Sequence, residues 1–369
     1  MSNFKFHWSQ DYSYRVENSL SARLKHTKGP ALITGHTGFK GTWLSLLLDF
    51  LDVPIIGFSL PPEGDSLYFR ASRQGKITEE FSDIRNYIDL KNFIDLHKPS
   101  VIVHMAAQPL VLQSYESPRE TFEVNVMGTA NILDIASKSK SVQIVIVVTT
   151  DKVYKNDNLG NKFKEYDSLF GKDPYSASKV GAEAVVAAWQ QISEMNNGPK
   201  IVSVRAGNVI GGGDLAKDRL LPDIVRSHLT GEPLLIRNKN HTRPWQHVLD
   251  PLIGYIKVID SLLAGNPIKT VNFGPIEKSL SVAKVIEICS TLIDFKFEYS
   301  EKKTEFQNLE SQTLELDTSY ANKVLNWYPK FNQADAIEQS INWWNKVLSN
   351  NVSAESACKD DIISYLAKR

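Results

Sequence analysis

The sequence predicts an α/β fold in which a doubly wound parallel sheet carries a smaller C-terminal lobe. Short apolar runs recur along the first 205 residues, amphipathic helical segments alternate with them, and glycine, proline and charged residues dominate after about residue 206. Strands that are apolar along their whole length indicate a sheet covered on both faces. Strands that alternate with helices indicate parallel pairing.

The expected elements follow in chain order. A helix after the first strand is predicted because Leu44, Leu47, Leu48 and Leu51 recur at helical spacing. In "QSINWWNKV" we expect a late helix. One of its two tryptophans, Trp343 and Trp344, is expected in the core and the other at the surface. Strands are expected in "ALIT" (31–34), "VPIIGFS" (53–59), just before Asp83, in "SVIVHMA" (100–106), in "VQIVIVV" (142–148) and in "KIVSVR" (200–205).

Composition excludes several classes of function. Lysine plus arginine and aspartate plus glutamate both number 42, so the net charge is zero and no nucleic acid partner is expected. No apolar run reaches the roughly 18–20 residues of a membrane span, and residues 1–29 do not resemble a secretion signal. The two cysteines suit a reducing compartment, so we expect a cytoplasmic protein without membrane association. The histidines near the motifs lack the spacing of metal ligands, so no metal is expected.

A glycine turn separates the first strand from the first helix. "TGHTGFKG" places Gly35, Gly38 and Gly41 in the pattern GxxGxxG. Such a turn lets backbone N–H groups and the helix N-terminus approach a pyrophosphate. Lys40 is assigned either to this phosphate or to a solvated turn. The predicted cofactor contacts in this turn are Gly35, Thr37, Gly38, Phe39, Lys40 and Gly41.

The rest of the dinucleotide site is less regular. Ser59 occupies the end of the second strand, where an acid usually holds the adenosine ribose, and no nearby arginine indicates a 2′-phosphate. These residues alone do not decide between NAD and NADP; NAD is the cofactor that we expect. Asp83 either reaches the adenine or is a surface turn residue, and Ile84 and Ala106 are further predicted contacts. We divide the chain into an N-terminal extension (1–29), a Rossmann-type NAD-binding domain (30–205), a nucleotide-sugar-binding lobe (206–347) and a short polar tail (348–369).

A tyrosine and a lysine lie one helical turn apart. Tyr175 and Lys179 in "DPYSASKVGAEAVVAAW" share a helix face, and the lysine ammonium is expected to lower the pKa of the phenol. Thr150, at the end of the preceding strand, adds a hydroxyl. Tyr175 and Lys179 would also contact the cofactor. This constellation predicts a base that takes a hydroxyl proton while hydride leaves the same carbon.

These motifs resemble the CDP-glucose 4,6-dehydratase family of the extended short-chain dehydrogenase/reductase (NAD-dependent epimerase/dehydratase) superfamily. The resemblance covers about residues 30–347 and rests on "TGHTGFKGTWLSL", "HMAAQPLV", "TTDKVY", "PYSASK", "RAGNVIGGGD", "DRLLPDI", "RPWQHV" and "VNFGP". Thr150 and Val153 stand where those enzymes often have Ser and Cys. The N-terminal segment is also longer than theirs.

The resemblance implies roles for Asp151 and Lys152, adjacent at the end of a buried strand. Oxidation of a sugar at C4 acidifies the C5 hydrogen, and an acid must protonate the departing C6 hydroxyl. By this match Asp151 is the acid and Lys152 the base, and the hydride then returns to C6. The implied reaction converts CDP-glucose to CDP-4-keto-6-deoxyglucose, for deoxysugar and surface-polysaccharide (O-antigen) synthesis.

The substrate contacts are also implied by this match. Matching positions in related enzymes hold the diphosphate or adjacent groups, and arginine suits phosphate because its fork binds two oxygens. Gln108 is expected to face the hexose or the nicotinamide, unless it is a satisfied loop amide. The resemblance also implies a homodimer or homotetramer, formed through the helices near 116–137 and 175–194. The other predicted substrate contacts are Asn208, Arg219, Arg237, Arg243 and Asn272, although each alone would suit a structural ion pair or a surface position.

Two other readings stay open. The first is a 4,6-dehydratase or a 4-epimerase that acts on another nucleotide sugar; an epimerase has no need for the Asp151–Lys152 pair. The second is a binding protein that keeps the fold without turnover, a class that commonly loses the catalytic Tyr or Lys. The preference for a CDP-sugar rests on the resemblance alone.

Overall fold

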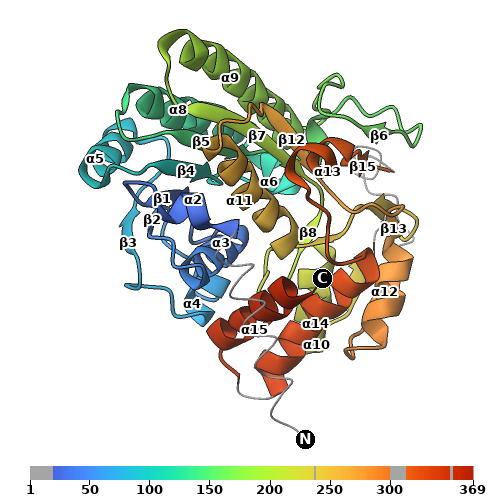
Figure 1. Ribbon diagram of the computed structural model, residues 1–369. Helices are drawn as coiled ribbons and strands as arrows, with labels where there is room; N and C mark the ends of the chain where they lie inside the picture. The colour runs from blue at the N-terminus through green and yellow to red at the C-terminus, as the bar shows by residue number, and fades with distance from the viewer. Residues whose placement is uncertain (1–19, 237, 300–312, 350–351, 369) are drawn as a thin grey trace, which may run out of the picture.

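The computed structural model describes residues 20–236, 238–299, 313–349 and 352–368 (Figure 1). Most of the predicted N-terminal extension and Arg237 therefore lie outside the described residues. Within them, the short helix α2 (Ala22–Lys25) packs against α11 (Leu249–Leu263), and Arg23 forms an ion pair with Asp260 at 2.7 Å. None of the described helices combines the length and apolar character needed to cross a bilayer.

A seven-stranded parallel sheet forms the centre of the molecule. Its order is β12-β7-β5-β4-β1-β2-β3, and every neighbouring pair is parallel. The order reverses direction between β1 and β4, which is where open α/β sheets bind their ligands. The strands are β1 (Ala31–Thr34), β2 (Ile55–Ser59), β3 (Thr78–Phe81), β4 (Val101–His104), β5 (Ile144–Val148), β7 (Lys200–Ala206) and β12 (Thr270–Phe273).

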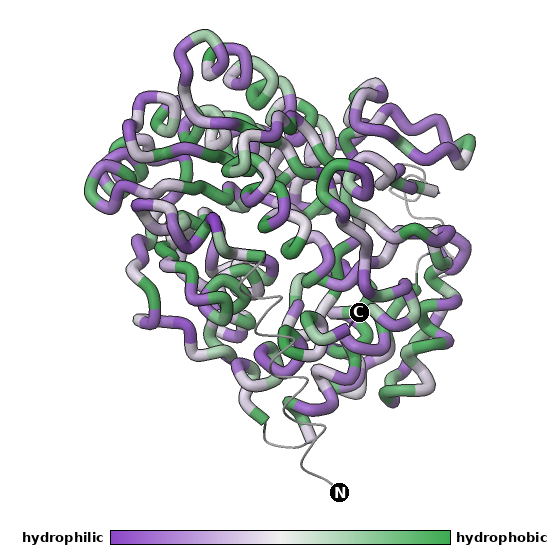
Figure 2. Tube along the Cα trace, viewed as in Figure 1, coloured by the Kyte–Doolittle hydropathy of each residue, from purple (hydrophilic) through white to green (hydrophobic). Residues whose placement is uncertain are grey.

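Helices cover both faces of the sheet, as the continuously apolar strands predicted. Because side chains alternate along a strand, neighbours such as Ile102 and Val103 enter different hydrophobic clusters. The tube in Figure 2 shows hydrophobic segments along these strands and on the helices beside them. One face is covered by α5 (Tyr87–His97), α8 (Gly128–Lys138) and α9 (Pro174–Asn196), and the other by α3 (Phe39–Phe50) and α11.

The other helices and strand pairs complete the described part of the chain. The remaining helices are α4 (Leu67–Arg70), α6 (Val111–Glu116), α7 (Pro118–Phe122), η1 (Glu123–Met127), η2 (Asp151–Val153), α10 (Leu220–Thr230), α12 (Val282–Ser290), α13 (Ser319–Leu325), α14 (Gln333–Ser349) and α15 (Ala354–Ala367). The two-stranded pairs are β6 (Lys162–Phe163) with β15 (Glu315–Leu316), β8 (Val209–Ile210) with β11 (Gln246–His247), β9 (Leu234–Ile236) with β14 (Phe297–Tyr299), and β10 (Thr242–Arg243) with β13 (Leu280–Ser281).

The predicted fold class is confirmed, with one addition from the second half of the chain. The strands expected before residue 206 all form in the central sheet. The seventh strand, β12, comes from the segment assigned to the substrate lobe and pairs with β7. Only four residues long, it overlaps the first three residues of the "VNFGP" motif. The sheet and the lobe therefore share a strand.

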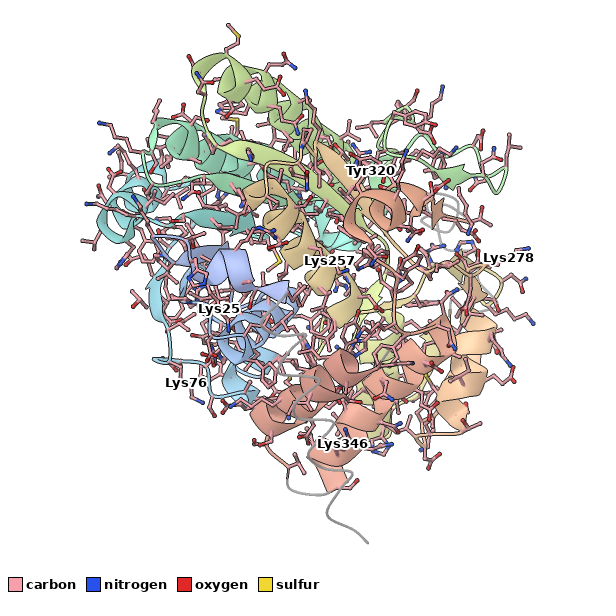
Figure 3. The ribbon with its side chains drawn as sticks, in the orientation of Figure 1. Lys25, Lys76, Lys257, Lys278, Tyr320 and Lys346 are labelled. Carbon is pink, nitrogen blue, oxygen red and sulfur yellow. The ribbon has the colours of Figure 1, made fainter. Side chains whose placement is uncertain are left out.

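The C-terminal helices belong to the same core. The expected surface tryptophan was wrong: Trp343 is 0% and Trp344 2% exposed, and their rings meet edge to face at 5.1 Å. Helix α14 runs through the boundary placed at residue 347, and α15 packs against α3. Charged side chains such as Lys76 and Lys346 lie at the periphery (Figure 3), where Lys76 contacts Glu355 of α15.

Candidate active site

The candidate site lies at the carboxyl ends of β1, β4 and β5. Gly35 follows β1 with φ of 74°, and its N–H donates to Phe58 O at 2.9 Å. A Cβ on Gly35 would lie 2.8 Å from Ala106 N, so the turn after β1 touches the segment after β4. Only glycine fits this close approach with a left-handed backbone. The predicted neighbours Gly35 and Ala106 are therefore brought together.

The second and third glycines shape the start of α3. A Cβ on Gly41 would lie 2.1 Å from Gly35 O, whereas Gly38 is exposed and a Cβ there would meet only Gly35 O, at 3.4 Å. Helix α3 begins at Phe39, so the open side of Gly38 adjoins free N–H groups at a helix N-terminus. This cradle suits the diphosphate of a dinucleotide.

Hydroxyl groups replace the usual acid at the end of β2. Thr37 Oγ1 lies 2.7 Å from Ser59 Oγ and donates to Leu60 O at 3.1 Å. Asp83 forms an ion pair with Arg85 at 2.7 Å, and this hydrogen bond lowers the pKa of Asp83. Ile84 is buried, in a position where a Cβ on Gly128 would meet it at 2.7 Å.

Lys40 points neither to solvent nor along the open side of the turn. Its Nζ donates to the hydroxyl of Tyr255 on α11 at 3.1 Å. Burial, followed by the charges of Lys179 and Arg219, lowers the pKa of Lys40 to about 7, and Asp151 opposes the shift. Of the two readings of Lys40, the solvated turn residue is wrong: its ammonium faces the predicted catalytic residues.

Thr150, Asp151 and Lys152 form one tight turn after β5. Thr150 caps the helix η2, since its Oγ1 accepts from Lys152 N at 3.3 Å and donates to Asp151 Oδ1 at 3.0 Å. Lys152 Nζ lies 3.3 Å from the same oxygen. Asp151 is fully buried and its Oδ2 has no hydrogen-bond partner. One carboxylate oxygen is therefore held while the other stays available.

Tyr175 stands opposite this turn at the start of α9. Asp173 caps the helix by accepting from Ser176 N at 2.8 Å, and Tyr175 N donates to Ser114 Oγ at 3.1 Å. Burial raises the pKa of Tyr175, while the charge of Lys152 and a hydrogen bond with Thr150 act in the lowering direction. These interactions bring the phenol within reach of the Thr150 turn.

Lys179 is not among the groups with the largest effects on the pKa of Tyr175, so the expected lowering by Lys179 stays a prediction. Lys179 Nζ donates to Val148 O at 3.3 Å, at the end of β5. The groups that lower the Tyr175 pKa are Lys152, Thr150 and Arg219, and burial outweighs them. Burial lowers the pKa of Lys179 itself to about 8, and Glu183 opposes that shift. Tyr175 and Lys179 share a helix face, as the spacing predicted, but the Lys179 ammonium is bound by the carbonyl of Val148 on β5.

The predicted substrate residues divide into two groups. Arg219 precedes α10, pairs with Asp214 at 3.3 Å and acts electrostatically on Tyr175, so it lies near the site. Asn208 keeps an Oδ1 without a partner. Arg243 is half-buried and donates to Thr242 O at 2.9 Å.

Gln108 and Asn272 are used by the fold itself. Gln108 Nε2 donates to Thr121 Oγ1 at 2.9 Å, and its Oε1 accepts from Leu110 N at 2.5 Å. Asn272 is fully buried, accepting from Tyr154 at 2.7 Å and donating to Phe163 O at 3.0 Å. In this structure neither amide faces an open site, so the loop-amide reading holds for Gln108 and the binding role of Asn272 is not supported by its geometry.

Sequence reasoning missed a buried network beside the site. Arg205 of β7 pairs with Glu183 of α9, and both contact the residues that flank the Thr150 turn. A signal was present, because an arginine ends the predicted strand "KIVSVR" and a glutamate lies four residues after Lys179. Charged residues are rarely buried unless paired.

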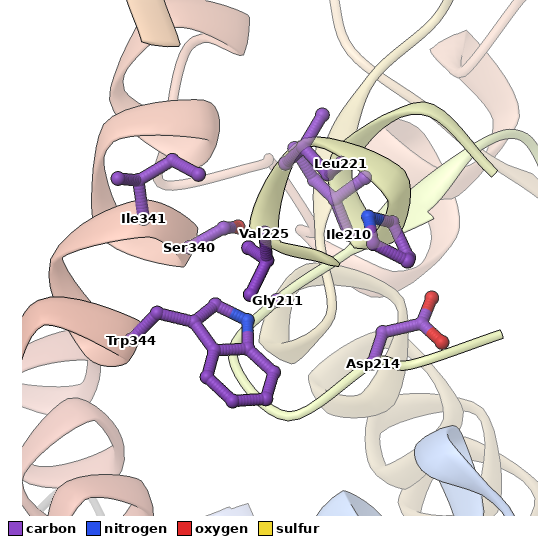
Figure 4. A pocket seen from close by; sticks show the side chains of 9 residues that line it. Ile210, Gly211, Asp214, Leu221, Val225, Ser340, Ile341 and Trp344 are labelled. Carbon is purple, nitrogen blue, oxygen red and sulfur yellow. The ribbon is translucent and has the colours of Figure 1, made fainter. Parts of the chain in front are cut away.

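Other features of the described residues do not compete with this site. A small pocket between α10 and α14 is mostly apolar and contains none of the predicted catalytic residues (Figure 4). Among the described residues, no group of three His, Cys, Asp or Glu side chains is arranged to hold a metal ion. The pocket is lined by Ile210, Gly211, Asp214, Leu221, Pro222, Val225, Ser340, Ile341 and Trp344.

Residues 31–274 match the model of the NAD dependent epimerase/dehydratase family. The chain belongs to this family. The match covers the glycine turn, the Thr150 turn, Tyr175 and Lys179, and membership confirms NAD as the cofactor. The residues that would hold it are those of the cradle at Gly38 and α3, together with the hydroxyls of Thr37 and Ser59.

Individual members of the family resemble the chain over most of its length. A CDP-glucose 4,6-dehydratase of Salmonella typhimurium is 38% identical over 322 residues, which are 84% of this chain and 89% of that protein. A dTDP-glucose 4,6-dehydratase of Escherichia coli is 24% identical over 75% of this chain and 83% of that protein.

Solved structures of the same family share the fold. A dTDP-glucose 4,6-dehydratase from Bacillus anthracis in complex with NAD has a TM-score of 0.71 at 22% identity, covering 86% of this chain and 97% of that one. A UDP-glucose 4-epimerase from Thermotoga maritima with UDP-glucose has a TM-score of 0.75 at 18% identity, covering 87% of this chain and all of that one.

Proposed function

We propose that the protein is a nucleotide-sugar 4,6-dehydratase and that its substrate is CDP-glucose. The observation that carries the reaction type is the Asp151–Lys152 pair at the carboxyl end of β5, within electrostatic reach of Tyr175. Oxidation or epimerisation at C4 needs only the Tyr175–Lys179 end of the site. An acid and a base in addition suit the loss of water across C5 and C6.

Each residue has a distinct task in this proposal. Tyr175 takes the O4 proton, assisted by the Thr150 hydroxyl. Lys152 removes the C5 proton, and Asp151 protonates the C6 hydroxyl, which otherwise leaves poorly as hydroxide. Bound NAD would supply reversible hydride transfer at this site, so that the hydride lost from C4 could return to C6 and no external oxidant would be consumed. Lys179 and Lys40 supply positive charge beside this centre.

The choice of CDP-glucose rests on the Salmonella typhimurium protein, which is 38% identical to this chain. Arg219 and Asn208 are proposed to face the diphosphate, because Arg219 lies near Tyr175 and Asn208 keeps a free acceptor. We place the enzyme in the cytoplasm, as a homodimer or homotetramer, in the synthesis of deoxysugars for surface polysaccharides such as O-antigen.

A substrate panel tests this proposal. Purified protein with NAD should lose one water from CDP-glucose with a higher kcat/KM than from the dTDP, UDP or GDP analogue. If the activity is highest with a sugar nucleotide that carries another nucleobase, the dehydratase assignment would stand and the CDP assignment would be overturned. Inversion at C4 without loss of water would overturn the dehydratase assignment.

A further inference from the structure

A bidentate ion pair is buried behind the Thr150 turn. Arg205 Nε donates to Glu183 Oε1 and its second terminal nitrogen to Oε2, both at 2.8 Å, and each side chain is 4% exposed. Two parallel hydrogen bonds fix both groups in orientation. Such a pair contributes little net stability, because both charges have lost their water. We therefore look for its role in the groups that the pair holds in place through its other contacts.

The pair holds both ends of the turn that carries the proposed acid and base. Thr149 Oγ1, just before the turn, donates to Glu183 Oε1 at 2.6 Å. Arg205 donates to the hydroxyl of Tyr154, just after the turn, at 2.8 Å. Residues 150–153 thus lie between two tethers to one ion pair.

The tethers extend into neighbouring elements. Tyr154 OH donates to Asn272 Oδ1 on β12 at 2.7 Å, and Arg205 also donates to Glu165 O at 2.9 Å. Glu183 lies one helical turn after Lys179, whose pKa it raises against the effect of burial. The same network therefore joins the turn, α9 and the edge of the sheet.

We propose that the Arg205–Glu183 pair positions the Thr150–Val153 turn through Thr149 and Tyr154, so that Asp151 and Lys152 meet C6 and C5 of the substrate. This inference rests on the proposed function. Arg205 and Glu183 are positioning residues, because their contacts with the turn pass through Thr149 and Tyr154. Elimination should be more sensitive to the tethers than hydride removal, since Tyr175 lies on α9 outside the turn.

Two conservative variants remove one tether each and leave the buried charges paired; Tyr154→Phe also removes the bond from Tyr154 to Asn272 Oδ1. Thr149→Val and Tyr154→Phe should each lower kcat about tenfold, the range expected for one hydrogen bond to a charged group. KM should change little. In a single turnover, NADH absorbance should accumulate above the wild-type level because elimination slows more than oxidation. Tyr87→Phe is the matched control, since it removes a tyrosine bond to Asp134 (2.6 Å) that involves neither the Thr150 turn nor its tethers.

Amide hydrogen exchange gives a readout that needs no substrate. Amides of residues 150–154 should exchange faster in Thr149→Val and Tyr154→Phe than in wild type or Tyr87→Phe. Unchanged exchange, with NADH accumulation like that of Tyr87→Phe, would overturn the inference. The two variants could also show faster exchange while the wild-type protein dehydrates no nucleotide sugar. That result would support the positioning role and overturn the proposed function.

Discussion

Lys152 Nζ lies 3.3 Å from Asp151 Oδ1, yet the two side chains occupy different environments. The Asp151 side chain is fully buried, whereas that of Lys152 is 31% exposed. One carboxyl oxygen of Asp151, Oδ2, has no hydrogen-bond partner. In the proposed reaction this carboxyl would face the C6 hydroxyl of the sugar, and the half-buried amine of Lys152 would face C5.

Replacing Lys152 should uncouple oxidation from elimination. Lys152→Ala is expected to lower dehydration by about 10²–10⁴-fold, the usual contribution of a general base. Because Tyr175 remains, NADH should form and persist on the enzyme in stopped-flow absorbance. Lys155→Ala removes an exposed lysine from the same loop and serves as the control. Product release at the wild-type rate by Lys152→Ala would remove the base assignment.

Replacing Asp151 tests the acid through its leaving group. Asp151→Asn is expected to slow dehydration of CDP-glucose by about 10²-fold or more. Fluoride leaves with less need of a proton, so CDP-6-deoxy-6-fluoroglucose should be processed by the variant at a rate much closer to wild type. Both substrates yield CDP-4-keto-6-deoxyglucose, and mass spectrometry measures the rate at which each is converted. Equal losses on both substrates would argue against an acid role.

The rate of C4 oxidation should depend on pH through Tyr175. Burial raises the pKa of Tyr175, and Lys152, Thr150 and Arg219 partly oppose it while Asp151 adds to it. The phenolate fraction therefore grows as pH rises through neutral values. Rapid NADH formation in the first turnover should increase with pH in wild type and be abolished in Tyr175→Phe. A pH-independent rate in wild type would contradict the role of the phenol.

A buried acid outside the site makes stability depend on pH. Burial raises the pKa of Asp250 to about 7, although Tyr365 donates to it at 2.6 Å. A raised folded-state pKa gives stability that is present below the unfolded pKa, near 4, and is lost as pH rises through 7. The unfolding free energy of Asp250→Asn minus that of wild type should thus increase by roughly 3 kcal/mol from pH 5 to pH 8. Denaturant titrations at both pH values measure this, and a constant difference would contradict it.

Local patterns in the sequence predicted much of this site. Gly35 and Gly41 are recognisable because they lie in the glycine turn between the first strand and the first helix. Thr150, Asp151 and Lys152 are recognisable because they follow the carboxyl end of an apolar strand. Tyr175 is placed by its helix start. In each case the strand end, turn or helix start that identifies the residue lies beside it in the sequence.

The remaining features depend on partners distant in sequence. Asn272 looked available for substrate, but Tyr154, 118 positions earlier, occupies its oxygen. Lys179 shares a helix face with Tyr175 and yet binds the carbonyl of Val148, on a strand. The Arg205–Glu183 pair is visible only once β7 and α9 are packed together. Periodicity cannot supply such contacts, since it describes one element at a time.

The most direct test of the account uses CDP-glucose deuterated at C4, incubated with the protein and NAD. Tyr175, Lys152 and Asp151 acting in sequence predict a product that has lost one water, carries the deuterium at C6 and forms without net NADH. A product of unchanged mass with inverted configuration at C4 would contradict the central claim and leave Asp151 and Lys152 without the chemistry assigned to them.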